Sequence, residues 1–256
     1  MASPDQNSFG FLRDTPNALR YENQSTDPDD VGPKLASLVS RTGRVLDVGC
    51  GTGSVTEIIS ARTDAEVIGI EPDPARSAVA ARRGLNVYCE YLSEEFLEKH
   101  GPFETILFAD VLEHLPNPGQ VLRIASKGLR PGGAIVASIP NVAHFFVRMN
   151  LLRGRFEYRD SGIMDATHLR WFTTETLHRF FFNLGFTVTD HLYTVNTDMC
   201  EYRSRPWRWL PYKLSAIRML VRIFPNLFGC QHVVRVVPID AKKQKMTSSG
   251  ATLIIR

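Results

Sequence analysis

Cysteine is scarce and scattered along this chain of 256 residues. Its four cysteines form no CxxC pair and lie far apart, at Cys50, Cys89, Cys200 and Cys230. This spacing excludes a disulfide framework and a zinc knuckle. It fits a reducing compartment, so we expect a cytoplasmic protein.

A set of acidic ligands for a metal ion is missing as well. The one adjacent pair of aspartates, Asp29–Asp30, lies near the N-terminus and follows no predicted strand. A magnesium-assisted reaction needs oxygen ligands gathered at one site. We therefore expect no metal.

Long apolar segments are also lacking. The first 20 residues contain no hydrophobic stretch of the kind found in signal peptides, so we expect none. The longest uncharged run contains Pro140, Asn141 and His144 and is too short to span a membrane. With 43% hydrophobic residues the chain can nevertheless bury an ordinary globular core.

Charges of the two signs are unevenly distributed. Residues 1–140 carry a net charge of −6, with 13 Lys and Arg against 19 Asp and Glu. Residues 141–256 carry +9, with 17 against 8, which indicates either two functions on one chain or simply a solvated surface. No RNA-binding signature accompanies the basic half, so we expect no nucleic-acid partner.

Strand and helix signals alternate through most of the chain. Residues 1–30 are polar and predict a flexible lead-in, and residues 241–256 predict a polar tail. Between them, over 31–240, short apolar strands alternate with helices, which predicts one doubly wound α/β domain with a mostly parallel sheet. The predicted strands are 44–49, 66–73, 86–92, 105–115, 134–141, 186–195 and 230–240. The predicted helices are 32–42, 53–62, 74–84, 118–133, 175–185 and 210–225. Residues 142–175 and 196–228 interrupt the alternation, and we interpret them as an inserted lid on the acceptor side.

The glycine-rich stretch VLDVGCGTG follows the first predicted strand, where doubly wound sheets bind ligands. Gly49 and Gly51 let a ligand approach the backbone, and Gly53 permits close helix packing. The GxGxG spacing and the carboxylate of Asp47 disfavour a pyrophosphate and favour a cationic ligand. Glu71, at the end of the next strand, suits ribose hydroxyls. These features together describe S-adenosylmethionine; the alternative is a tight turn without a ligand.

Four blocks of the chain resemble the class I S-adenosylmethionine-dependent methyltransferases. They are VLDVGCGTG, VIGIEPD, ILFADVLEHLPNP and LRPGGAIVASIPN, in the order and spacing of that family. The resemblance implies a Rossmann-like sheet of seven strands, one of them antiparallel and near the edge. It also implies that the cofactor is held by Asp47, Gly49, Cys50, Gly51, Glu71, Pro72, Tyr91, Leu92, Ala109 and Asp110.

Within that resemblance, each part of the cofactor has expected neighbours. Asp47, Gly49 and Gly51 would line the methionine part, and Asp110 would lie near it. Glu71 would hold the ribose, while Tyr91 and Leu92 would flank the adenine. Many members of the family place an Asp after the third strand to bind the adenine amino group. This chain reads CEYLSEEF there, so Glu90 or a backbone group must substitute.

Three histidines lie where a methyl acceptor could reach them. His114 follows the fourth strand, His144 follows the fifth, and His168 lies in the first irregular region. Transfer to a hydroxyl needs a base, and imidazole suits that task near neutral pH. We rank His168 first because Asp165, three residues earlier, could orient its ring. Structural hydrogen bonding or packing is the alternative for each histidine.

The segment 139–173 carries a narrower resemblance, to methyltransferases of glycan and glycosylated-metabolite pathways. More distantly it is similar to ubiquinone-pathway O-methyltransferases and to a methionine-biosynthesis protein of the same fold. It implies O-methylation of a sugar or glycosylated small molecule. Alternatives are N-methylation of a small amine and a non-catalytic partner protein of this fold. Arginines crowd this stretch and could bind a phosphorylated or lipid-linked acceptor, or could pair with local acids: Arg148, Arg153, Arg155, Arg159 and Arg170.

A basic amphipathic segment, 207–224, lies within the second irregular region. Trp207 and Trp209 lie among arginines, and a helix from Tyr212 gathers apolar residues on one face and Arg218 and Arg222 on another. We expect a cap helix on the sheet or a contact in a homodimer. The alternative is a peripheral contact with an anionic membrane.

Overall fold

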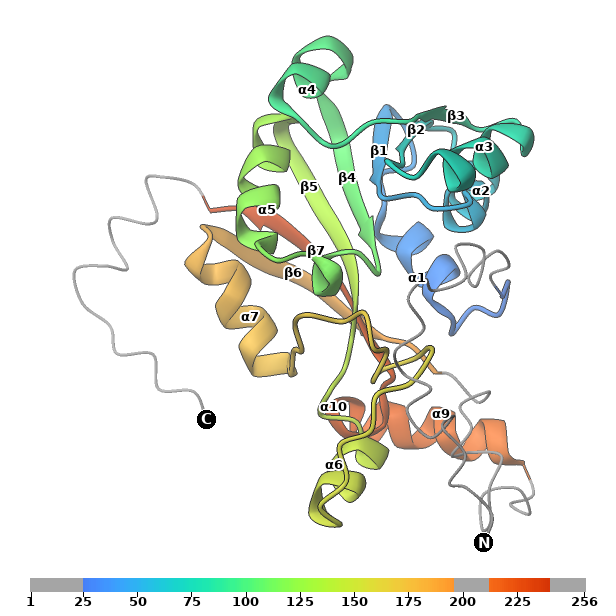
Figure 1. Ribbon diagram of the computed structural model, residues 1–256, viewed down its shortest axis with the longest axis vertical. Coiled ribbons are helices and arrows are strands. Elements are labelled where there is room, and N and C mark those ends of the chain that lie inside the picture. Colours follow the sequence, from blue (N-terminus) through green and yellow to red (C-terminus); the bar gives the residue numbers. More distant parts are fainter. Residues whose placement is uncertain (1–24, 196–211, 240–256) are drawn as a thin grey trace, which may run out of the picture.

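The computed structural model describes residues 25–195 and 212–239. They form an α/β fold around one seven-stranded sheet (Figure 1) with the strand order β3-β2-β1-β4-β5-β7-β6. Strand β7 is antiparallel to both of its neighbours, and the other pairs are parallel. The predicted fold class is thereby confirmed, including the antiparallel strand beside the sheet edge.

The elements follow one another as the alternating pattern predicts. The strands are β1 Arg44–Val48, β2 Glu66–Ile70, β3 Asn86–Tyr88, β4 Phe103–Ala109, β5 Leu129–Pro140, β6 Phe186–Tyr193 and β7 Gln231–Pro238. The helices are α1 Val31–Leu38, α2 Ser54–Arg62, α3 Pro74–Arg82, α4 Glu94–His100, the short 3-10 turn η2 Leu112–His114, α5 Pro118–Lys127, α6 Phe145–Leu152, α7 Thr174–Asn183, α9 Lys213–Ile223 and α10 Pro225–Phe228.

Helices cover both faces of the sheet, so its central strands are apolar on both sides. Ile106 and Leu107 are neighbours on β4 and are both fully buried. Ile106 packs into the core cluster under α4, α5 and α7, whereas Leu107 packs into the cluster under α1 and α2. Because strands β1 to β5 are parallel, their carboxyl ends lie at one edge of the sheet, and the loops at this edge carry predicted site residues.

Three α-helices were not predicted: α4, α6 and the short α10, which starts at Pro225. Helix α4 begins after Ser93, whose side chain accepts a hydrogen bond from the Phe96 backbone N–H. Helix α6 begins after His144, whose ring accepts from the Phe146 N–H. Helix α5 ends earlier than predicted, because Gly128 caps it and β5 starts at Leu129.

The last residues of the predicted lead-in are packed against the domain. Asp30 caps α1 by accepting from the Val31 N–H at 2.8 Å. Asp29 and Asp27 both accept hydrogen bonds from the Arg218 guanidinium on α9. The predictions for residues 1–24, for the tail from 240 and for 196–211, with Trp207 and Trp209, lie outside the described residues. Within the described ranges, no helix is long and apolar enough to cross a membrane.

Candidate cofactor and acceptor site

The loop between β1 and α2 presents bare backbone to open space. Gly49, Gly51 and Gly53 have φ angles of +70°, +58° and +81°, which favour glycine. A Cβ on Gly51 would meet no atom within 4 Å, whereas one on Gly53 would lie 2.3 Å from Leu85 Cδ1. Gly51 therefore borders space that a ligand can occupy, and Gly53 permits the close packing expected of it.

Glu71, just beyond the end of β2, holds this loop in place. Its Oε2 accepts from the Gly51 N–H at 2.9 Å, and its Oε1 accepts from the Asp73 N–H at 2.9 Å. A carboxylate oxygen offers two lone pairs, so each oxygen can accept a second hydrogen bond. The side chain can thus fix the loop and still bind two ribose hydroxyls, as predicted for this position.

Asp47, at the end of β1, is fully buried beneath the same loop. Its Oδ2 accepts from Thr56 Oγ1 at 2.7 Å, while Oδ1 has no hydrogen-bond partner among the described residues. Burial raises the pKa of this carboxyl to about 7, and the negative charge of Glu71 adds to the effect. A buried, incompletely satisfied carboxylate beside an open loop fits a ligand that carries an ammonium group.

Asp110 lies at the same edge, where β4, β5 and β7 meet. Its backbone has a φ of +53°, unusual for a residue other than glycine. Its N–H donates to Ser138 Oγ at 2.9 Å, and its Oδ1 accepts from Ser138 Oγ and from Gln231 Nε2 at 2.6 and 2.9 Å. Burial raises the pKa of Asp110 despite these hydrogen bonds. Three strands therefore fix this carboxyl group beside Ala109, the last residue of β4.

The residues expected near the adenine lie at the ends of β2 and β3. Leu92 packs against the core, whereas the side chain of Tyr91 is 79% exposed. Glu90 is exposed as well, and Pro72 is half-buried. Cys50, which is buried in the glycine loop, packs against Gly69 on β2. The structure thus brings the predicted cofactor residues to one edge, and their individual contacts with the cofactor stay predictions.

Two of the three candidate histidines lie together, although 53 residues separate them in the chain. The rings of His114 and His168 have centroids 4.8 Å apart. Each Nδ1 contacts a backbone carbonyl, that of Thr167 at 3.2 Å for His114 and that of Ile163 at 3.1 Å for His168. Because a carbonyl only accepts, both Nδ1 atoms carry the proton, and Nε2 is the basic atom of each neutral ring.

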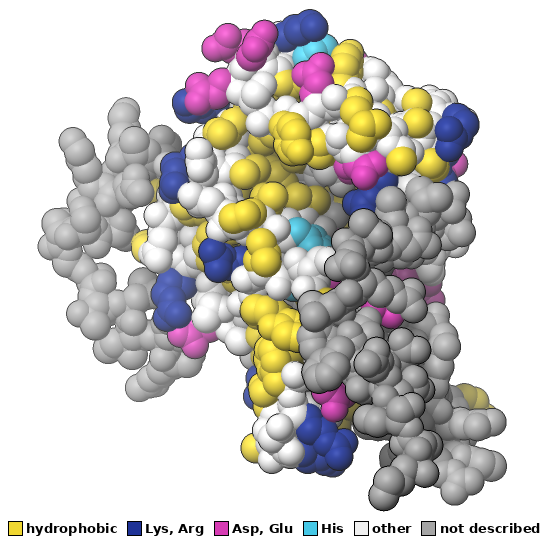
Figure 2. Space-filling view, in the orientation of Figure 1, with side chains coloured by type: hydrophobic (Ala, Val, Ile, Leu, Met, Phe, Trp, Pro, Cys, Tyr) yellow, Lys and Arg dark blue, Asp and Glu magenta, His cyan; other side chains and the backbone are white. Residues whose placement is uncertain are grey.

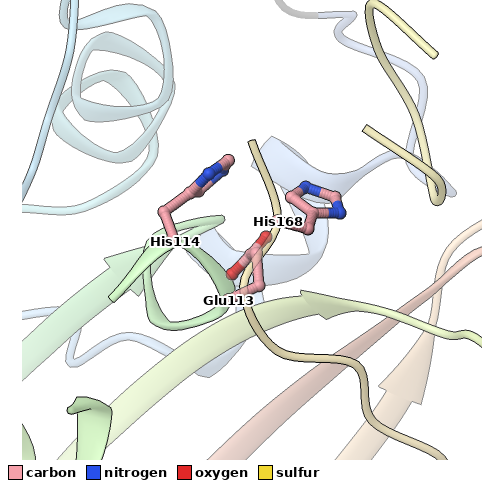
Figure 3. A group of neighbouring side chains, drawn as sticks. All are labelled: Glu113, His114 and His168. Carbon is pink, nitrogen blue, oxygen red and sulfur yellow. The ribbon is translucent and has the colours of Figure 1, made fainter. Parts of the chain in front are cut away.

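Glu113 lies beside these histidines and was missed by the sequence analysis. Figure 3 shows its carboxylate pointing toward the gap between the two rings. One ligand atom from each of Glu113, His114 and His168 lies within 4.8 Å of the others. One carboxylate and two imidazoles form a donor set that can hold a divalent cation. No spacing within the sequence reveals this group, because His168 comes from a distant segment.

The Glu113 carboxylate is fully buried, and neither of its oxygens has a hydrogen-bond partner among the described residues. Burial raises its pKa well above the usual value, and the charges of Asp110 and Asp165 add to the increase. Its backbone carbonyl accepts from the N–H groups of Leu169 and Arg170. This connection fixes the segment of His168 against η2.

Asp165 is linked to His114 through a threonine. Its Oδ1 accepts from the Thr167 N–H at 2.8 Å and from Thr167 Oγ1 at 2.6 Å. Since Thr167 Oγ1 donates to Asp165, it can accept from His114 Nδ1, which lies 3.1 Å away. His114 is half-buried, whereas His168 is only 6% exposed. Of the pair, His114 is therefore the more accessible to an acceptor, contrary to our ranking from the sequence.

His144 lies apart from this pair and has a structural role. It is fully buried, its Nδ1 accepts from the Phe146 N–H at 3.3 Å, and its Nε2 lies 3.9 Å from Cys230 Sγ. A ring that caps α6 and contacts a buried cysteine is not available to an acceptor. We therefore assign His144 to helix capping and packing, which was its alternative role.

The arginines of the predicted cluster have different surroundings. Arg148 Nε and Arg170 Nη2 donate to the backbone carbonyls of Ala143 and Pro116, and Arg153 and Arg155 are exposed at the end of α6. Three aromatic rings pack edge-to-face or tilted nearby, those of Phe156, Tyr158 and Trp171. Figure 2 shows the face of the molecule seen in Figure 1, and on it a histidine side chain lies in a hollow between groups of hydrophobic side chains.

Comparison with known proteins links this arrangement to methyl transfer. Residues 21–191 match the model of a protein family described as a methyltransferase domain. A ubiquinone biosynthesis O-methyltransferase of Xylella fastidiosa (strain M23) is 32% identical over 214 residues, which cover 77% of this chain and 76% of the relative. The narrower resemblance to glycan-pathway enzymes stays a prediction, since this relative is named for ubiquinone biosynthesis.

Solved structures share the fold. A SAM-dependent methyltransferase from Archaeoglobus fulgidus has a TM-score of 0.54 and 19% identity, covering 78% of this chain and 88% of its own. The 1,6-didemethyltoxoflavin-N1-methyltransferase of Burkholderia thailandensis, solved with S-adenosylhomocysteine, has a TM-score of 0.51 and 18% identity over 83% of this chain and 80% of its own. At these identities the likeness concerns the fold.

Proposed function

Because this chain belongs to the methyltransferase-domain family, we propose that it methylates a hydroxyl group of a small molecule. S-adenosylmethionine is its cofactor. The orientation of the His114 ring supports an oxygen as the methyl acceptor. Thr167 and Asp165 orient this ring so that Nε2 is its basic atom. A positioned base is needed for a hydroxyl acceptor, whereas a neutral amine can attack without one.

The residues divide the work as follows. When bound, the cofactor supplies a methyl group on a cationic sulfur, which departs as a neutral thioether and needs no acid. Asp47 holds the ammonium group, Glu71 the ribose, and the open backbone at Gly51 lets the methionine part approach. His114 Nε2 takes the proton of the acceptor hydroxyl as the new carbon–oxygen bond forms. Holding the acceptor oxygen in line with the methyl group supplies much of the rate enhancement.

An aromatic hydroxyl is the acceptor we favour. The curated relative is named for the biosynthesis of ubiquinone, a quinone, and its 32% identity supports related chemistry here. The partly exposed rings of Phe156 and Tyr158, which pack with Trp171, offer an apolar wall against which a flat ring can stack. A sugar hydroxyl is the second candidate, which the exposed arginines Arg153 and Arg155 favour if the sugar is phosphorylated.

The test uses the purified chain with methyl-labelled S-adenosylmethionine. Catechols and nucleotide-sugars are offered in parallel, and label in a phenolic methyl ether is the expected result. Replacing His114 by Gln should lower kcat about 100-fold or more while the affinity for the cofactor stays unchanged. His100→Gln, on α4, is the matched control and should retain full activity.

Three other results would contradict the proposal. Label in sugars alone would reassign the acceptor. Label on nitrogen, with a rate indifferent to His114→Gln, would favour an amine acceptor. Calorimetric binding of the cofactor without turnover on any acceptor in a host extract would favour a non-catalytic partner protein.

A further inference from the structure

Helices α6, α9 and α10 form a small unit at one end of the molecule, away from α4 (Figure 1). Ile217 and Val221, one turn apart on α9, are buried against Phe146 of α6 and Phe228 of α10. The rings of Phe145 and Phe228 also stack, with centroids 5.7 Å apart. This unit, called here the helical end, is therefore held together by one side of α9.

The other side of α9 is apolar too, and it faces solvent. Met219 and Ile223 are 55% and 58% exposed, and Tyr212, at the N-terminus of the helix, is 87% exposed. Met219 and Ile223 are four residues apart and therefore lie on one stripe, opposite the stripe of Ile217 and Val221. A helix that only capped the sheet would carry polar residues along this stripe.

Helix α6 adds to the exposed apolar surface of the helical end. Leu151 and Leu152, in its last turn, are 50% and 79% exposed. Phe224, directly after α9, is 54% exposed. Adjacent large apolar side chains that no other part of the described chain covers indicate a surface that binds something.

The charge of the helical end indicates what it binds. Neither 141–156 nor 212–239 contains a single acidic residue. Arg218 is neutralised by Asp27 and Asp29, but the exposed Arg153, Arg155 and Arg222 form no ion pair within residues 25–195 and 212–239. In Figure 2 hydrophobic side chains continue down to this end, where a group of Lys and Arg side chains lies beside one acidic side chain.

We infer that the helical end docks on the surface of an anionic lipid bilayer. Exposed leucine, isoleucine, methionine and phenylalanine enter the interface between headgroups and acyl chains, and the unpaired arginines meet the negative headgroups. A second copy of this chain would match the apolar stripe but not the charge, because it would bring the same unpaired arginines. The inference does not depend on the proposed reaction.

Vesicle co-flotation of the full chain tests this inference. The protein is mixed with vesicles of phosphatidylcholine alone or with 30% phosphatidylglycerol. We expect flotation with the anionic vesicles only, weakened by added salt. Arg153→Gln with Arg155→Gln should weaken binding about 30-fold, about fivefold for each charge removed. The matched control is Arg62→Gln with Arg82→Gln, on exposed positions of α2 and α3, and it should bind as the wild type does.

A second variant separates a membrane from a second copy of the chain. Leu152→Ser with Ile223→Ser keeps every charge and should abolish flotation without changing the monomeric mass in sedimentation. Equal binding to both kinds of vesicle, or to neither, would overturn the inference. So would a wild-type dimer that this variant converts to a monomer, since the apolar stripe would then be a dimer interface. Far-ultraviolet circular dichroism confirms that each variant is folded.

Discussion

Single residues at the strand edge determine how the site responds to pH, and Asp47 is the clearest case. Burial raises its folded pKa to about 7, above the ordinary value of 3.8. For an acid with a raised folded pKa, stability is present below the unfolded pKa and is lost as pH rises through the folded pKa. The contribution of Asp47 to the free energy of unfolding without cofactor should therefore fall by about 2 to 3 kcal/mol between pH 5 and pH 8.

Urea unfolding of the wild type and of Asp47→Asn measures this dependence. The asparagine cannot ionise, so the difference in free energy of unfolding between the two proteins should change by about 2 to 3 kcal/mol over the same range. The variant should also bind S-adenosylmethionine about tenfold or more weakly, because it offers no charge to the ammonium group. Parallel curves for the two proteins would show that Asp47 is not the group that titrates.

Gly51 provides a second prediction at the residue scale. Gly51→Ala would place a methyl group in the open space beside the loop, at a φ of +58°. Gly84→Ala is a matched control, since Gly84 has a φ of +80° and its added Cβ would also meet no atom. Both should lose about 1 kcal/mol of stability from backbone strain. Only Gly51→Ala should weaken cofactor binding, measured by calorimetry, and an equal loss in both would place the ligand elsewhere.

The place of the expected cofactor residues in the fold could be predicted from the sequence, and the surroundings of the candidate histidines only in part. Asp47 is the second-last residue of β1, and Gly51 and Glu71 lie in short blocks after β1 and β2, so the sequence order itself predicts their place at the strand edge. The contacts of Glu113 with His168 depend on how the irregular segment 142–172 folds back onto η2. No periodicity describes that path, and for this reason Glu113 and Thr167 gave no signal.

At the scale of elements, patterning predicted the strands because they are apolar on both faces. It missed α4 and α6 for different reasons. Helix α4 has a capping serine, Ser93, and two acids in its first turn, which together are a helix-start signal. The same stretch, CEYLSEEF, was interpreted only as a neighbour of the adenine. Helix α6 is capped by the ring of His144 and lacks acids in its first turn, so the usual signals of a helix N-terminus are missing from its sequence.

Strands β6 and β7 and helix α7 share a chain of three imidazoles that should make the fold sensitive to acid. His178 Nε2 lies 2.9 Å from His191 Nδ1, and His191 Nε2 lies 3.1 Å from His232 Nδ1. Burial lowers the pKa of His191 to about 4 and that of His232 to about 3. For a histidine with a lowered folded pKa, stability is present above the unfolded pKa of about 6.5 and is lost as pH falls below it.

The expected loss from His191 alone is about 2 kcal/mol between pH 7.5 and pH 5. His191→Gln removes this titration, so its free energy of unfolding should fall less over that range, although it starts lower because hydrogen bonds are lost. His178→Gln, at the exposed end of the chain of rings, should retain most of the wild-type pH dependence. Urea unfolding at the two pH values measures both, and identical slopes in wild type and His191→Gln would contradict the assignment.

At the scale of the whole molecule, one arginine joins parts of the chain 189 residues apart. Arg218 Nε donates to Asp29 Oδ2 at 2.5 Å, and Nη2 donates to Asp27 Oδ1 at 3.2 Å. The Asp29 carbonyl also accepts from the Val195 N–H. These contacts tie the start of the described chain to the helical end.

Arg218 and Arg222 lie one turn apart on α9, but of the two only Arg218 forms ion pairs among the described residues. The two arginines should therefore behave differently when replaced. Arg218→Gln removes the arginine partner of both carboxylates, although Asp29 keeps Lys34, and should lower Tm by a few degrees, whereas Arg222→Gln should leave Tm unchanged. Burial alone would raise the pKa of Asp29, but Arg218 and Lys34 outweigh it and lower the pKa, so their stabilisation is present above pH 4 and lost as pH falls further. Thermal melts at pH 7 and pH 3 test this, because the gap between wild type and Arg218→Gln should narrow in acid. A gap that persists at pH 3 would mean that Arg218 stabilises the helical end by packing of its stem and not through its charge.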